Sequence, residues 1–474
     1  GPFSSLYGPG FQFMDVQLLG SPRFEDGPAT AGSTLMDFRT NGNQWHGRQT
    51  LMGGDADWGY RFGYSHRTGN DYVAGDGTPV ASSYNSRMFD FTVGRDLDEE
   101  SSIEFTYLRL DQTDVEFPGM AFDMDFLVTD GYEVTYNTSG MDWNDRLTVD
   151  AWYNQTRFSG NAQSAAKRQQ FPLLDFFQYE GFTDVNAMSS GFRAASEWQP
   201  EENHSVTAGV DLRYIRQELN EIASGRIGFN VFTDANSPIP RSDQVDPGFF
   251  VEDQRALDNG WTISSGGRID VVNSDIIDDP AKLNAVGLNT PQSSFADIVG
   301  SDEYHQNFML WMGHVTAQRE LSETTGLDVS FGFAQQNPTL TELYAAETFL
   351  FLLQNGQNTA TGDPRLKSED RFQLDVGLSW EKDRWRGKVV GFHAWVNDYI
   401  TFENIGAFAG PPLGQIEQVA LKYVNTDLAT LAGVEFYGEY EMQKELTLFG
   451  NLSYVQGTDR TRAGSFATQP ASPG

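Results

Sequence analysis

Apolar and polar residues alternate one by one along much of the chain. In the run from Trp58 to Tyr64, every second residue is aromatic and the residues between are glycine or arginine. The same period of two recurs in the segments 205–214, 327–334, 372–381 and 434–442. Successive side chains of a β-strand point to opposite faces, so each run predicts a strand with one apolar and one polar face.

The predicted strands are long, often ten residues or more, whereas strands of globular proteins average ~5–6 residues. Aromatic residues also lie near the predicted strand ends, namely Tyr214, Trp380, Trp385 and Tyr454. Aromatic girdles at both membrane interfaces are typical of transmembrane β-barrels. A large soluble β-sandwich or β-propeller also alternates and is the alternative architecture.

The connections between strands alternate in length. Short turns are predicted at 96–100, 199–203, 258–260, 381–384 and 443–445, and Asn259-Gly260 favours a tight hairpin. Between them are long polar stretches, at Ser159–Asp184, Asn220–Asp246, Asn273–Glu303, Gln336–Lys367 and Thr401–Tyr423. Short turns on one rim and long loops on the other characterise outer-membrane barrels. The pattern predicts an all-β fold, a transmembrane antiparallel barrel of roughly sixteen strands.

Composition supports this architecture. The chain has 474 residues, 48 glycines, 13% aromatic residues and only 39% hydrophobic residues. No apolar run approaches the ~18–20 residues of a membrane helix, so a membrane would have to be crossed by strands. The absence of cysteine excludes disulfides and thiolate metal sites.

The net charge of −34 excludes nucleic acid as a partner, because binding it requires a basic face. The simple interpretation of the charge is solubility and repulsion between loops. The functional interpretation is an acidic surface that attracts cationic or metal-bearing solutes.

The first forty residues differ from the rest. Gly1–Asp37 contains turn residues but few alternating runs, which predicts a compact non-barrel segment before a first strand near Gln44. The last stretch, Ala463–Gly474, is loop-like and contains no strand pattern.

Several segments resemble the TonB-dependent receptor family. Gly1–Gly10 (GPFSSLYGPG) is similar to the end of that family's plug domain. Asn337–Tyr344 (NPTLTELY) and Asp363–Glu369 (DPRLKSE) resemble two family motifs that follow a mid-barrel strand, and Gly433-Val434-Glu435 begins a strand as the family's Gly-Val-Glu does. One departure is Phe11–Val16, where the family usually has Gly-Gly-Val-Ile-Asn.

The resemblance implies residues 1–40 as the C-terminal remnant of a plug and residues 41–474 as an incomplete barrel, about 16 of about 22 strands. It also implies outer-membrane localisation, no enzymatic activity, no cofactor, and the TonB–ExbB–ExbD complex as partner. We therefore expect the fold to be an open barrel. The implied function is active uptake of a scarce solute, chiefly an iron–siderophore or similar metal chelate.

Lumen-facing positions should carry the polar half of each alternation, since charge on the lipid face costs about 2–4 kcal/mol for Lys or Arg at midplane. The candidates are Arg61, Asp211, Arg213, Asp328, Asp375, Glu435 and Glu439. For each of them, plain solvation in the lumen or contact with the plug is the alternative to a role in transport.

Solute contacts are expected from aromatic residues of the long loops and the plug, which could stack on a planar chelate or a sugar. The candidates are Tyr7, Phe11, Phe13, Phe176, Phe177, Tyr179, Tyr344, Phe349 and Phe351. The alternative is that they pack the loops over the mouth of the barrel.

No catalytic motif and no metal site is predicted. Met120, Asp123, Met124 and Asp125 have donor atoms that suit a soft metal, but a packed loop is the favoured interpretation. Two other functions stay open: a passive porin, which would lack a plug, and a soluble β-rich carbohydrate-binding module, which would need no detergent.

Overall fold

A computed structural model describes residues 4–6, 19–120, 122–139, 141–170, 172–176, 178–278, 284–285, 293–346, 348–349, 359–409 and 417–461. The strands are β1 (Ala29–Arg39), β2 (Gln44–Gly54), β3 (Trp58–Gly69), β4 (Tyr72–Val73), β5 (Pro79–Val80), β6 (Tyr84–Asp96), β7 (Ser101–Val115), β8 (Asp123–Thr138), β9 (Arg146–Asn161), β10 (Glu180–Glu201), β11 (His204–Ile227), β12 (Asn230–Ala256), β13 (Trp261–Ile276), β14 (Asn284–Ala285), β15 (Ser293–Ser294), β16 (Gln306–Ser322), β17 (Thr325–Gln336), β18 (Thr348–Phe349), β19 (Thr359–Thr361), β20 (Glu369–Lys382), β21 (Trp385–Ala409), β22 (Glu417–Gln443) and β23 (Leu446–Asp459). In the part of the chain that the structure describes, four short helices lie in the connections: α1 (Ala165–Gln170), α2 (Pro172–Phe176), α3 (Phe295–Val299) and α4 (Leu340–Tyr344).

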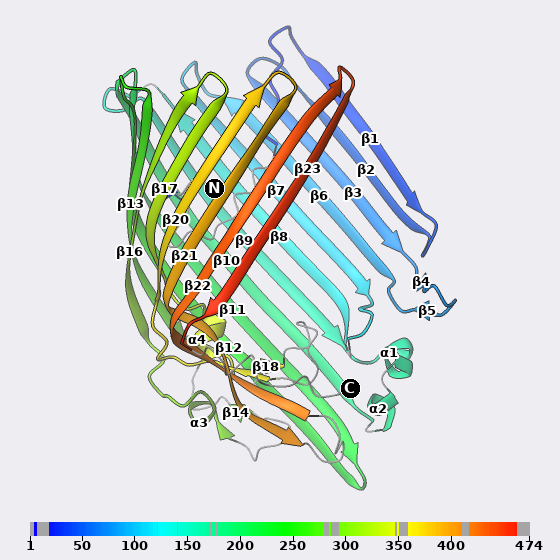
Figure 1. The fold of residues 1–474 in the computed structure, drawn as a ribbon. Helices are drawn as coiled ribbons and strands as arrows, with labels where there is room; N and C mark the ends of the chain where they lie inside the picture. Colours follow the sequence, from blue (N-terminus) through cyan, green and yellow to red (C-terminus); the bar gives the residue numbers. More distant parts are fainter. Residues whose placement is uncertain are drawn as a thin grey trace.

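One large sheet of 19 strands dominates the fold. Two of these strands, β18 and β19, have only two and three residues, which leaves seventeen long strands, close to the expected sixteen. Each long strand pairs antiparallel with the next long strand along the chain. Within the described residues β1 pairs only with β2 and β23 only with β22, and the sheet curves into an open wall (Figure 1). The expectation of an open, all-β barrel is confirmed.

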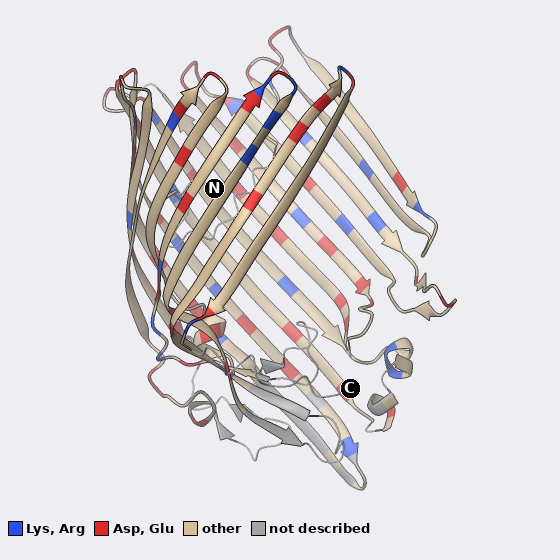
Figure 2. Ribbon diagram, in the orientation of Figure 1, with Lys and Arg blue, Asp and Glu red and all other residues tan. Residues whose placement is uncertain are grey.

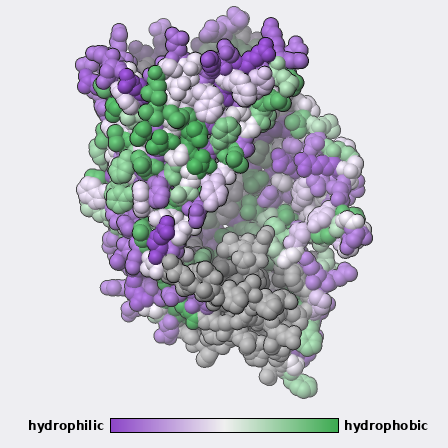
Figure 3. Space-filling model, in the orientation of Figure 1, coloured by the Kyte–Doolittle hydropathy of each residue, from purple (hydrophilic) through white to green (hydrophobic). Residues whose placement is uncertain are grey.

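Alternation places apolar and polar side chains on opposite faces of the wall. Along β20, Leu374 and Val376 are 39% and 43% exposed, whereas Gln373 and Asp375, which alternate with them, are 9% and 6% exposed. Apolar side chains gather over the middle of the wall between more polar rims (Figure 3). The exposed apolar face therefore suits lipid, and the polar face lines the inside of the curve.

The two rims of the wall differ, as the sequence predicts. At one rim the connections are two to seven residues long, for example between β10 and β11 and between β20 and β21. At the other rim lie the longest connections, which carry all four helices (Figure 1). In outer-membrane barrels the longer loops face the cell exterior, so we name the rim with the long connections the exterior rim. No helix within the described ranges is long and apolar enough to cross a bilayer.

The predicted start of the sheet is wrong. The first strand is β1, which begins at Ala29 and pairs with β2 from Ala29↔Gly54 to Arg39↔Gln44. Its first half, Ala-Thr-Ala-Gly-Ser-Thr, lacks the large apolar residues that mark the later strands. Backbone pairing with β2, rather than side-chain pattern, defines this strand, so the sheet begins inside the segment expected to be a plug remnant.

The prediction of long loops is also largely wrong for two segments. Most of Asn220–Asp246 and Thr401–Tyr423 belongs to the paired strands β11–β12 and β21–β22, which continue past the other strands at the exterior rim (Figure 1). Polar composition suggested loops. A strand pair that stands in water needs no apolar face, because its backbone groups satisfy one another.

Candidate functional site

The structure places all seven predicted lumen-facing residues in strands, on the face opposite the exposed apolar side chains. Asp211 and Asp375 are each 6% exposed, and their neighbours Val210 and Leu374 are exposed on the other side. The other five are Arg61, Arg213, Asp328, Glu435 and Glu439, and alternation and strand register put them on the same inner face. Figure 2 shows charged positions distributed along many strands of the wall.

Ion pairs join many inner-face charges across strands. The pairs are Arg48 with Asp90 at 2.8 Å, Arg193 with Asp150 at 2.9 Å, Lys388 with Asp328 at 3.0 Å, and Arg386 with Glu439 at 2.5 Å. In each of these pairs the cation and the carboxylate come from different strands. These pairs thus balance part of the charge on the inner face.

Four buried charged residues form a cluster with Arg213 on β11, β12 and β13. Arg268, whose side chain is 0% exposed, donates to both carboxylate oxygens of Asp211 at 2.6 and 2.7 Å and to Asp270 at 2.5–2.9 Å. Arg213 pairs with Asp246. A Cβ on Gly248 would lie 2.1 Å from Nη2 of Arg268, so only glycine at this position of β12 leaves room for the cluster.

Residues 4–6 dock on this part of the wall. Glu252 of β12 accepts hydrogen bonds from the Ser5 amide at 2.6 Å, the Ser4 hydroxyl at 2.9 Å and the Ser5 hydroxyl at 3.0 Å. Arg268 donates to the carbonyl of Ser5 at 3.4 Å. The hydrogen bonds to Glu252 are charge-assisted and hold this segment against the inner face of the sheet.

A second anchor lies near the rim with short turns. Glu104 of β7 accepts from the amide and hydroxyl of Ser21 at 2.8 and 2.6 Å, and Arg23 donates two bonds of 2.9 Å to Asp96. The N-terminal segment therefore touches the wall at two places. Its assignment as a plug remnant stays a prediction, and the candidates Tyr7, Phe11 and Phe13 lie outside the described residues.

At the exterior rim, two long connections share a small apolar core. Its buried residues are Ile276, Phe295, Val299, Leu340, Leu343, Tyr344, Ala346, Leu366 and Ile400. Helix α4 begins at a capping box, in which Thr339 accepts from the Glu342 amide at 3.2 Å and Glu342 accepts from the Thr339 amide at 2.7 Å. The cap lets this five-residue helix form, and its apolar side chains enter the core.

The segment 359–369 closes over α4. The amides of Gly362 and Asp363 donate to the carbonyls of Ala345 and Glu342 at 2.7 and 2.9 Å. Asp363 also pairs with Arg365 at 2.8 Å and with Lys422 of β22 at 3.0 Å. Burial raises the pKa of Asp363, but its hydrogen bonds with Arg365 and Lys422 lower that pKa by more, so the net pKa lies below the ordinary value.

For Tyr344 the structure favours the packing alternative. Its side chain is 0% exposed and its hydroxyl donates to the carbonyl of Tyr304 at 2.5 Å, and burial raises its pKa. Phe176, by contrast, is 74% exposed at the end of α2 on the exterior rim, close in sequence to Tyr179. Phe349 lies in β18. The candidates Phe177 and Phe351 lie outside the described residues.

Another connection is pinned by a buried lysine. Lys167 of α1 is 0% exposed and its ammonium contacts Asp123 at 2.9 Å and the carbonyl of Phe117 at 2.8 Å. Met124, which follows Asp123 in the chain, is 4% exposed. Asp123 and Met124, both in β8, thus take part in an ion pair and in packing, respectively.

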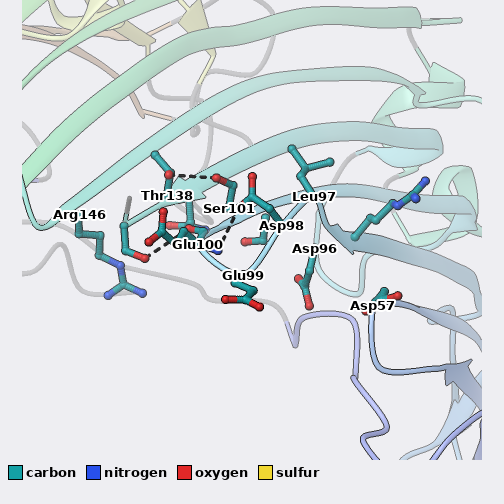
Figure 4. A pocket seen from close by; sticks show the side chains of 13 residues that line it. Asp57, Asp96, Leu97, Asp98, Glu99, Glu100, Ser101, Thr138 and Arg146 are labelled. Atoms are coloured by element: carbon teal, nitrogen blue, oxygen red, sulfur yellow. Dashed lines mark hydrogen bonds between the residues drawn. The ribbon is translucent and has the colours of Figure 1, made fainter. Parts of the chain in front are cut away.

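An open cleft of about 650 Å³ lies at the opposite rim. It is bordered by the short turns between β6 and β7 and between β8 and β9, and by Asp57, Asp98, Glu99, Glu100 and Arg146 (Figure 4). Asp98 is used locally, since it accepts from the Glu100 amide at 2.9 Å. Because the cleft is at the short-turn rim, it is remote from the long loops.

The sequence analysis did not predict four residues in and beside the cluster on β11–β13: Asp246, Glu252, Arg268 and Asp270. Strand β13 alternates polar Arg268, Asp270 and Ser274 with apolar Ile269 and Val271, so the rule used for the other strands would have found two of them. That Glu252 holds Ser4 and Ser5, about 250 residues away, has no sequence signal.

A family model described as "TonB dependent receptor-like, beta-barrel" matches residues 84–473. No curated protein matches the sequence. Among solved structures, the chain is similar to the copper transporter OprC, with a TM-score of 0.76, 19% identity, and coverage of 97% of this chain and 68% of that chain.

Two further structures are similar in fold. The siderophore receptor PirA from Pseudomonas aeruginosa has a TM-score of 0.59 and 14% identity, covering 91% of this chain and 66% of that chain. The ferric citrate transporter FecA in the unliganded form has a TM-score of 0.60 and 12% identity, covering 93% and 61%. The chain thus spans about two thirds of the length of the structures it matches.

Proposed function

Because the chain belongs to the TonB-dependent receptor family, a family of bacterial outer-membrane transporters and not of enzymes, we propose that the full-length protein takes up a metal-bearing solute, an iron–siderophore or similar metal chelate. The family match over residues 84–473 carries the proposal. In support, the similar structures named above are a copper transporter, a siderophore receptor and a ferric citrate transporter.

In this proposal the solute is captured at the exterior rim, where the long connections lie. Phe176 and Tyr179 stack on the chelate, together with Phe177, Phe349 and Phe351. Aromatic faces suit planar ligands and cost little conformational entropy when they are held by a loop. Energy arrives through TonB, ExbB and ExbD in the inner membrane, acting on the plug.

The proposal is tested by uptake in a bacterial host that lacks its own metal receptors. Cells that express the full-length protein are given radioactive iron as a siderophore or citrate chelate, or radioactive copper. We expect accumulation of at least one of these, and its loss in an isogenic host without TonB or after the proton gradient is collapsed. Accumulation that persists without TonB would instead identify a passive channel.

A pair of variants locates the capture site. Phe176→Ala removes an exposed aromatic ring from the exterior rim and should weaken solute binding about 2–13-fold, from a stacking contact of about 0.5–1.5 kcal/mol. Leu97→Ala, at a site 55% exposed on the opposite rim, should leave binding unchanged. Equal solute binding by both variants would show that Phe176 does not contact the solute. It would not contradict the proposed transport function.

A further inference from the structure

Charged side chains also lie on the outer, apolar face of the wall, on the neighbouring strands β6–β9 (Figure 1). Along β7, Arg109 and Asp111 follow the exposed Ile103 at even spacing, whereas Glu104, which binds Ser21, is at odd spacing. Side chains two residues apart share a face of a strand. Arg109 and Asp111 therefore point outward, on the face that suits lipid.

Strand register collects the outer charges into two rows. The row closer to the exterior rim is Arg87, Asp111, Val128 and Arg157, on β6, β7, β8 and β9. The next row toward the middle of the wall is Phe89, Arg109, Asp130 and Gln155. The row after that is entirely aromatic, namely Phe91, Tyr107, Tyr132 and Tyr153. Aromatic rows mark the boundary between hydrocarbon and headgroups, so both charged rows lie on the exterior side of such a boundary.

The height of the rows can be checked on β6. Arg87 and Arg95 are on the same outer face of this strand and bracket Phe89, Phe91 and Val93. Eight residues at a rise of ~3.4 Å span ~27 Å along the strand, or ~21 Å across a membrane for a tilt of ~40°. The apolar band of an outer-membrane barrel is ~25 Å tall. Arg87 is thus at the level of the headgroups of the outer leaflet, where charge costs little.

The two charged rows carry a net positive charge, because three guanidinium groups face two carboxylates. Asp130 accepts from Arg109 at 2.9 and 3.2 Å and from Arg157 at 3.3 Å. Asp111 accepts from Arg109 at 3.3 Å and lies 3.9 Å from Arg87. The formal sum is +1, in a chain whose net charge is −34.

Two of the arginines keep donors for a further partner. The side chains of Arg87 and Arg157 are 41% and 51% exposed. Within the described ranges, Arg87 donates one hydrogen bond, to Thr113 at 3.2 Å, and Arg157 donates one, to Asp130. A guanidinium group has five N–H donors. Phosphate oxygens are the acceptors that match this planar fork.

The neighbouring strands add no carboxylate to either row. Opposite Arg87 on β3 is His66, and opposite Arg157 on β10 is Asn186. Asp184, on the same face of β10, lies one row closer to the rim. Also closer to the rim are the carboxylates of Asp114, Glu116 and Asp125. Among the described residues none of these four carboxylates forms an ion pair with the three arginines.

We propose that the two charged rows bind the phosphorylated headgroup of an anionic lipid in the outer leaflet. Arg87 and Arg157 donate to phosphate oxygens. Asp111 and Asp130 hold the guanidinium groups on the surface of the wall, and the aromatic row packs against the adjoining ends of the acyl chains. The site lies on the outside of the wall, so it is separate from the loops where the solute is proposed to bind.

The test is native mass spectrometry of the purified full-length protein in detergent, titrated with lipid A that carries two phosphates or with phosphatidylcholine. We expect the wild type to bind lipid A more tightly. Arg87→Gln combined with Arg157→Gln should weaken lipid A binding about 30-fold, which is about 2 kcal/mol for two arginines at a membrane surface, and leave phosphatidylcholine binding unchanged. If the double variant does not assemble, Arg157→Gln alone, at a half-exposed side chain, should weaken lipid A binding about 5-fold.

Arg95→Gln is the matched control. Arg95 is on the same face of the same strand but at the short-turn rim, where it borders the acidic cleft (Figure 4), so R95Q removes the same charge and should keep lipid A binding. Equal affinity of the wild type and the R87Q/R157Q variant for lipid A, or an equal loss in R95Q, would overturn the proposal. Inorganic phosphate should not displace lipid A. Complete displacement would identify a site for free phosphate instead and would also overturn it.

Discussion

The shared core of the exterior connections makes a sharp prediction for Leu343→Ala. Leu343 of α4 is 0% exposed and belongs to the same cluster as Phe295 and Val299 of α3. Truncating a fully buried leucine to alanine costs about 2–5 kcal/mol, from lost transfer free energy and the cavity left behind. The loss should fall on both connections, because each buries its apolar residues against the other.

The loss of local stability in L343A can be measured by hydrogen exchange. A loss of about 3 kcal/mol raises the population of the open state more than about a hundredfold, provided that opening is local. In L343A we expect the amides of 295–300 and 340–346 to exchange faster by this factor, and together. Amides of β20, which belong to the wall, should be unchanged.

Leu97→Ala is the matched control for this variant, since Leu97 is 55% exposed in a short turn at the other rim and surface substitutions usually change stability by less than about 0.5 kcal/mol. Faster exchange in 340–346 alone would refute the reasoning, because it would show that the two connections do not stabilise one another.

Three more predictions concern single contacts. Tyr344→Phe removes the donor to the Tyr304 carbonyl and should cost about 1–3 kcal/mol, measured as faster exchange at 340–346; unchanged exchange would contradict it. Because the folded pKa of Asp363 lies below its ordinary value of 3.8, its ion pairs stabilise the segment above that pH, and protection of 359–369 from protease should be lost as pH falls below it; Asp363→Asn should show no such loss, and equal pH dependence would argue against the ion pairs. Gly248→Ala places a Cβ 2.1 Å from Arg268 and should lower Tm by several degrees or prevent assembly, whereas an unchanged Tm would show that the cluster tolerates displacement.

The sequence determined the architecture because its signals are local. Alternation with a period of two needs only neighbouring residues, and it identified strands such as β3, β17 and β20 and the inner face that holds Asp211 and Asp375. Turn residues likewise placed the short connections within a few residues. Where the local signal is weak the prediction failed: β1 begins with small residues, and the outer halves of β11 and β12 are rich in polar residues and turn formers.

Only the tertiary structure decided which residues meet. Glu252 binds Ser4 and Ser5, and Tyr344 is buried in a core to which two connections and the strands β13 and β21 contribute. Composition could not distinguish an aromatic residue that binds a solute from one that packs in a core. Both kinds of residue occur in long polar connections. Likewise, the alternation within each strand predicts which charged side chains face inward. Which of those charges pair depends on how neighbouring strands are placed beside one another. Burial and pairing are properties of contacts between distant segments, and contacts of that kind leave no period in the sequence.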